Sequence, residues 1–221
     1  MDMVHDWNVF RSDVYGSSRS RFLHVSNTTY YTMVDKEIIA ENWSIPLTER
    51  DVTLEEAAAS MNEWKLTQSE VPLIIQLVEN PKYRLKWLFP GSVTLRVHDY
   101  AHILLGRGVL VKDEAFVIGF TMGSTTQMTT LRASLFLLCA RYMYPDGYRF
   151  YDAEAKIFRD GVRLAKIMKC KDLSRFDFSV CNTRSVSYVR DKVGLDIPLL
   201  RAYYEYEKKN NKESRECQRL V

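Results

Sequence analysis

The chain has 221 residues, of which 46% are apolar and 27% charged, as in ordinary globular proteins. Its 31 basic and 28 acidic residues give a net charge of +3, which is too balanced for the concentrated basic face of a nucleic-acid-binding protein. A chain of this length can bury a core without help from a metal or a disulfide. A metal site in it would therefore be functional.

The sequence contains no segment that suits secretion or membrane insertion. The first twenty residues hold three aspartates and no apolar stretch of the signal-peptide kind. The longest apolar run, Leu135–Ala140, is far too short to cross a bilayer. The four cysteines show no paired metal spacing and are expected to be reduced thiols. We therefore expect a cytoplasmic protein whose membrane contact, if any, is peripheral.

Helical signals dominate after an irregular start. Residues 1–43 are rich in β-branched and aromatic side chains in short segments and predict an irregular N-terminal arm. Thr53 followed by Glu56 is a capping box that opens an alanine-rich helix. A second helix is predicted from Pro72, a first-turn proline, to the break at Pro81.

Two helices joined by a glycine-rich turn are predicted in the middle of the chain. Ser92 is predicted to cap the first, which runs to about Leu105 and is ended by Gly106-Arg-Gly. Asp113 is predicted to cap the second, which extends to about Phe120. The next helix is predicted over residues 124–144, ended by Pro145.

A long amphipathic helix over Tyr151–Met168 and two shorter ones over Arg184–Val193 and Pro198–Lys208 complete the prediction. The expected fold is all-α, an orthogonal helical bundle in a single domain. That domain covers residues 44–208, between the arm of residues 1–43 and a charged, flexible tail over residues 209–221.

The segment from His98 to Glu114 carries the chemistry of the sequence. His98 and His102 are four residues apart, so a helix directs both imidazoles at one point, which is a common half of a metal site. Asp99 lies at the edge of the same face and would either bind the ion or orient an imidazole. The glycine turn allows Glu114 to return opposite the histidines. Two nitrogens and one or two carboxylates suit one divalent ion, Zn, Mg, Mn or Fe. The alternative is a polar hydrogen-bond network that merely contains histidines.

His98-Asp99-x-x-His102 followed by eleven residues and Glu114 resembles the metal motif of the coenzyme Q (ubiquinone) biosynthesis protein four family. Leu104-Leu-Gly after the motif looks similar, as do Gly161-Val-Arg-Leu-Ala and Tyr188-Val-Arg with Gly194-Leu downstream. The likeness covers roughly residues 70–200, and only the metal segment of it is specific. The family's Leu-Pro and glycine-rich approach is absent, and Asp113 stands where the family has a small residue, which indicates a distant member.

The resemblance implies a metal-dependent protein of ubiquinone or prenylquinone biosynthesis that binds or modifies a prenylated, isoprenoid lipid. Its chemistry would be removal of a ring carboxylate with hydroxylation of that carbon, as an oxidative decarboxylase or lyase. The ion would hold a carboxylate or ring oxygen, and Asp99 or metal-bound water would move protons. The expected partners are the prenylated lipid, quinone-biosynthesis enzymes and a second copy of the chain in a homodimer, with peripheral membrane contact.

Further residues are candidates for binding such a ligand. Phe116 and Phe120 would line a slot for the prenyl chain, or simply pack the helices together. Gly119 and Gly123, one helical turn apart, would leave room for a ligand or allow two helices to approach closely. The remaining candidates are two arginines, which would hold a phosphate or be solvated charges: Arg96 and Arg107.

Two alternatives to the enzyme stay open. One is a non-catalytic carrier or scaffold that uses its metal to fix a lipid head group. The other is a metal-dependent phosphohydrolase with a His-Asp doublet, which would need an upstream histidine such as His5 or His24 and would not need His102. Phosphate loops, zinc-protease motifs, nucleophile elbows and paired Glu-x-x-His motifs are all missing from the sequence.

Overall fold

The computed structural model describes residues 42–61 and 88–220. The arm predicted over residues 1–43 and the helix predicted between Pro72 and Pro81 lie, apart from residues 42 and 43, outside this part of the chain. Within it all regular elements are helical, with one isolated bridge between Thr53 and Ser185. The all-α prediction is confirmed. The elements are α2 (Leu54–Ala59), α4 (Leu95–Leu105), α5 (Val111–Gly123), α6 (Thr130–Tyr142), α7 (Asp152–Met168), η2 (Phe178–Cys181), α8 (Val186–Val193), α9 (Ile197–Asn210) and α10 (Arg215–Gln218).

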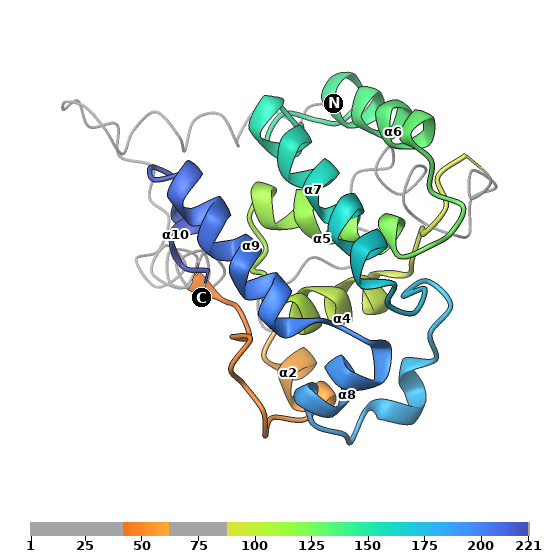
Figure 1. Cartoon of the computed structure of the whole chain (residues 1–221), viewed down its shortest axis with the longest axis vertical. Coiled ribbons are helices and arrows are strands. Elements are labelled where there is room, and N and C mark those ends of the chain that lie inside the picture. Colours follow the sequence, from red (N-terminus) through yellow and green to blue (C-terminus); the bar gives the residue numbers. More distant parts are fainter. Residues whose placement is uncertain (1–41, 62–87, 221) are drawn as a thin grey trace, which may run out of the picture. The chain divides into compact units, whose positions relative to one another are not determined.

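The close pairing of α5 with α7 forms the centre of the domain (Figure 1). α4 packs against α5 at one end of this pair, and α2 and α8 pack against α4 and against each other. Helix α5 is buried along nearly its whole length, which explains why its sequence is apolar on all sides rather than on one stripe. Glu114 of the predicted metal motif therefore lies on the most enclosed helix of the described part of the domain.

Local signals place most helix ends close to their predicted positions. The Thr53–Glu56 capping box is present, with Thr53 N bound to Glu56 Oε2 at 2.9 Å. Gly106 ends α4 in the left-handed conformation at φ 65°, which glycine adopts without a Cβ penalty. The side chains of Ser185 and Asp196 cap α8 and α9. Both residues lie within two positions of the predicted starts of these helices.

Three predicted helix starts were displaced. Ser92 does not cap α4, because its hydroxyl donates to the carbonyl of Phe89 at 2.7 Å and the helix begins after Thr94. Asp113 is the third residue of α5, where its carboxylate accepts from the backbone N–H of Leu110. The helix expected from residue 124 begins at Thr130, capped by the preceding threonine.

The segment predicted as a flexible tail contains α10, which packs against α9 and α5. Cys217 and Leu220 are buried there, and Arg219 pairs with Asp113 on α5. Sequence composition alone did not indicate this packing, because the segment is mostly polar and its two buried residues are spaced three apart on a single short turn.

No helix in the described ranges is both long enough and apolar enough to cross a membrane.

Candidate metal centre

Two histidines on α4 direct their ring nitrogens at one point. His98 and His102 stack edge to face with their Nε2 atoms 3.0 Å apart. His102 is almost completely buried, and its Nδ1 lies 2.6 Å from the carbonyl oxygen of Gly108. A carbonyl can only accept, so the Nδ1 of His102 carries the hydrogen, and in the neutral ring Nε2 keeps its lone pair. This contact is the usual support of a metal-binding imidazole.

Glu114 on α5 completes the group from the opposite side. Its two carboxylate oxygens lie 2.8 Å from His98 Nε2 and 3.3 Å from His102 Nε2. Atoms bound to one ion at about 2.0–2.2 Å lie roughly 3–3.5 Å from each other. The three side chains offer ligand atoms that all lie within 4.8 Å of one another, so together they could hold a metal ion.

The charge of the centre suits a cation. Burial on its own would raise the pKa of Glu114, but the adjacent His102 and His98 lower it well below its ordinary value. Glu114 is therefore an anion at neutral pH. The side chain of Glu114 is 30% exposed, whereas that of His102 is 1% exposed. The group is thus reached from the Glu114 side and closed on the His102 side, which leaves room for a further ligand on an ion.

Asp99 is not one of the three clustered residues. It is buried on α4, next in sequence to His98. Its carboxylate is not among the ligand atoms that lie within 4.8 Å of one another.

The two arginines proposed as phosphate ligands lie in different surroundings. Arg107 is fully buried, and its guanidinium makes two hydrogen bonds to Glu207, at 2.8 and 2.5 Å. Its guanidinium carbon also lies 4.0 Å from the ring centroid of Phe116 and 4.3 Å from that of Tyr204. Arg107 is therefore a buried structural cation, neither a solvated charge nor a group presented to a ligand. Arg96 is exposed and binds the Tyr100 hydroxyl at 2.7 Å.

The residues proposed to line a prenyl slot are packed against the protein itself. Phe116 and Phe120 are fully buried, and Phe116 stacks on Tyr203 with ring centroids 5.4 Å apart. A Cβ on Gly119 would lie 3.0 Å from the Cα of Phe158 on α7, and one on Gly123 would lie 2.6 Å from the Cα of Val162. Of the two explanations that the sequence left open for these glycines, the close approach of two helices agrees with the contacts to α7.

A second group of charged residues, whose pairing the sequence did not predict, lies next to the cluster. Asp113 is fully buried and pairs with Arg219 from the C-terminal segment and, at 3.9 Å, with Arg107. Arg219 also lies against Gly108, where a side chain would collide with its guanidinium. No local pattern links residues more than a hundred positions apart, so this support could not be predicted.

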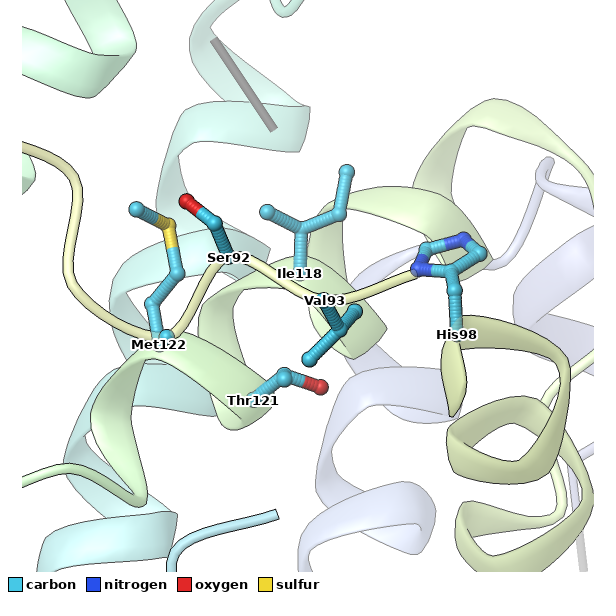
Figure 2. Close-up of a pocket in the computed structure, with 7 residues that line it drawn as sticks. Ser92, Val93, His98, Ile118, Thr121 and Met122 are labelled. Atoms are coloured by element: carbon cyan, nitrogen blue, oxygen red, sulfur yellow. The ribbon is translucent and has the colours of Figure 1, made fainter. Parts of the chain in front are cut away.

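A small pocket adjoins the cluster on the His98 side (Figure 2). It lies between the segment that precedes α4 and one face of α5. Its lining residues are Gly91, Ser92, Val93, His98, Ile118, Thr121 and Met122. A signal for this pocket was present in the sequence, because Ile118 and Thr121 follow Glu114 by four and seven residues and so share its helix face.

The comparisons with known proteins give no family for this chain. No family model matches the sequence, no curated protein matches it, and no solved structure matches it.

Proposed function

We propose that this chain binds one divalent metal ion through His98, His102 and Glu114 and uses it to hold an oxygen atom of a prenylated, quinone-type ligand. The proposed metal binding rests on three ligand atoms that lie within 4.8 Å of one another. One of them belongs to the imidazole of His102, which the Gly108 carbonyl holds in place. The ligand class rests on the resemblance of the His98–Glu114 segment to the ubiquinone-biosynthesis family. Contact with a membrane surface is proposed only because such a ligand resides there.

The chemistry would be divided among few groups. A bound divalent ion supplies Lewis-acid stabilisation of negative charge on a ligand oxygen. His98 and His102 would hold it through Nε2, and Gly108 keeps the His102 ring in the required tautomer. Glu114 offsets one unit of the ion's charge, so the centre would keep a net positive charge and attract an anionic head group. Asp99 is proposed to take or give the proton that such a reaction exchanges.

Native mass spectrometry combined with elemental analysis tests the proposed metal binding directly. The protein as purified, or after incubation with Zn²⁺, Mn²⁺, Fe²⁺ or Co²⁺, is expected to carry one ion per chain. His98→Ala and His102→Ala are each expected to remove it while the helical circular-dichroism signal stays unchanged. His5→Ala and His24→Ala are matched controls, because the chain has four histidines and these two lie outside the motif. Equal metal content in all five proteins would overturn the proposal.

Turnover distinguishes an enzyme from a carrier. Metal-loaded protein is incubated with a prenylated hydroxybenzoate and oxygen. The lipid is then extracted and its mass is measured by mass spectrometry. Loss of the ring carboxylate with wild-type protein, but not with His102→Ala, would establish an oxidative decarboxylase. Recovery of an unchanged lipid that co-purifies with the protein would instead establish the non-catalytic carrier.

A further inference from the structure

Helix α6 carries apolar side chains on two opposite faces. Its inward face packs on the core through Phe136, which is fully buried and stacks on Phe158 of α7 with ring centroids 4.9 Å apart. A surface helix of a globular domain normally presents polar residues on its outward face. On α6 the outward positions include Leu131, Leu138 and Tyr142, whose side chains are 79%, 55% and 69% exposed. The described part of the chain therefore leaves an apolar face of α6 uncovered.

These side chains form one continuous stripe, which we call the α6 stripe. Leu131, Leu135, Leu138 and Tyr142 follow one another at intervals of four, three and four residues, the spacing that aligns side chains along one face of a helix. Met143 lies at the end of the stripe and is 54% exposed. Of the nine large apolar side chains that are exposed in the described ranges, four belong to this short segment. Apolar residues gathered in this way, rather than scattered singly, indicate a surface that meets a partner.

The charges around the α6 stripe are mainly positive. α6 contains two arginines and no acidic residue. Arg132 of α6 and Lys166 of α7 donate to backbone carbonyls just before α6, at 2.6 and 2.7 Å, and neither has a carboxylate partner among the described residues. At the other end of the helix, Arg141 is paired with Asp152. Residues 127–169, which include α6 and α7, contain eight basic and four acidic residues and so carry a net charge of +4, more than the +3 of the whole chain.

We propose that the α6 stripe docks the protein on the surface of a membrane that contains anionic lipids. An apolar helix face bordered by cations enters the boundary between acyl chains and head groups, and the cations pair with anionic head groups. α6 has 13 residues and is about 20 Å long, so it lies in this boundary and does not cross the bilayer. Tyr142 suits that depth because its ring is apolar and its hydroxyl polar. The purpose of docking rests on the proposed function, which places a prenylated ligand in the membrane, but the stripe and its charges do not involve the metal ligands.

A second copy of the chain fits this face less well. In a two-fold dimer the same patch of each copy meets the other. Two α6 helices packed on each other would bring four arginines into one interface, with no carboxylate of α6 to oppose them. Like charges across an interface disfavour association, whereas an anionic membrane surface supplies the opposite charge.

Vesicle flotation with the full chain tests this assignment. The vesicles contain either phosphatidylcholine alone or phosphatidylcholine and phosphatidylserine in about equal parts. Wild-type protein is expected to float with the anionic vesicles, and less of it at high salt. The double variant Leu131→Ser/Leu138→Ser is expected to bind these vesicles at least about tenfold more weakly, because two leucines no longer leave water on docking. Arg132→Gln is expected to weaken binding about fivefold through the loss of one cation near the surface.

A matched control changes two exposed apolar residues away from α6. Val180 and Tyr188 are 69% and 43% exposed, and Val180→Ser/Tyr188→Ser is expected to bind vesicles as the wild type does. All four substituted leucine and control positions are exposed, so the helical circular-dichroism signal should stay unchanged, and it is recorded for each variant. His102→Ala is also expected to float as the wild type does, because docking does not depend on the metal ion.

The possible outcomes separate docking from the proposed metal binding. Equal flotation of wild type and Leu131→Ser/Leu138→Ser, or equal binding of wild type to both kinds of vesicle, would refute the assignment. Wild-type protein that floats with neither vesicle would also refute it. If analytical ultracentrifugation then showed a wild-type dimer that the double variant lacks, the α6 stripe would be the contact between two copies. Protein that loads metal and does not float leaves the metal centre standing, and protein that floats without taking up metal leaves the docking surface standing.

Discussion

Replacement of Gly119 by alanine separates the two explanations that the sequence offers for the glycines of α5. The new Cβ would lie 3.0 Å from the Cα and the carbonyl carbon of Phe158, and closer still to its carbonyl oxygen. All three atoms belong to the backbone of α7, so no side chain can turn away to relieve the contact. The helices must separate by about 1 Å, which removes a quarter to a half of the dispersion attraction at the affected contacts.

We expect Gly119→Ala to destabilise the domain by about 3 kcal/mol, at the upper end of ordinary overpacking, because α5 and α7 form the main helix contact of the fold. For a domain of this size the melting temperature should fall by roughly 6–12 °C. Urea unfolding followed by circular dichroism measures the free-energy change. Gly147→Ala is the control: nothing lies within 4 Å of its added Cβ, and its φ of 89° costs about 1–2 kcal/mol.

A different result would refute the packing explanation. If Gly119→Ala were as stable as Gly147→Ala but no longer bound a prenylated lipid that wild-type protein binds, the glycine would be making room for a ligand after all.

Further predictions concern the buried charges. Glu207→Gln should cost about 3–5 kcal/mol in urea unfolding, because it leaves the guanidinium of Arg107 buried without its carboxylate. Burial raises the pKa of Glu207 but Arg107 lowers it more, so the folded pKa lies below the ordinary 4.5. This stabilisation is complete above about pH 4.5 and is lost as the pH falls through the folded pKa; a pH series of melts should show the loss in wild type and not in Glu207→Gln. Arg219→Met removes the cation that is paired with Asp113, the residue directly before the proposed ligand Glu114. This change should weaken Co²⁺ binding about tenfold in a chelator competition. Arg215→Met, an exposed change on the same segment, should leave that affinity unaltered.

The clustering of two histidines with one glutamate was predictable because its information is local. His98, His102 and Glu114 lie within seventeen consecutive residues, and helix periodicity with one left-handed glycine, Gly106, is sufficient to bring them together. The same local rules found the Thr53 cap. They failed at Ser92, because a hydroxyl can bond a preceding carbonyl as readily as it caps a helix.

The surroundings of the cluster were not predictable for the opposite reason. Arg107 was expected to hold a phosphate or to be a solvated charge, and only the fold reveals that Glu207, a hundred positions away, is its partner. The burial of Asp113 likewise depends on Arg219 from the C-terminal segment. Nothing in the sequence near either residue reports these long-range pairs.

The contact between His102 Nδ1 and the Gly108 carbonyl has a consequence for how an ion would enter. The ring is already oriented by a loop of the protein, within a domain whose core is built from apolar side chains. In a zinc finger the ion must assemble its own ligands, so that binding and folding are one event. In this protein the ordering of His102 is completed during folding, so an ion bound there would join a finished scaffold and would exchange while the helices around it stay in place.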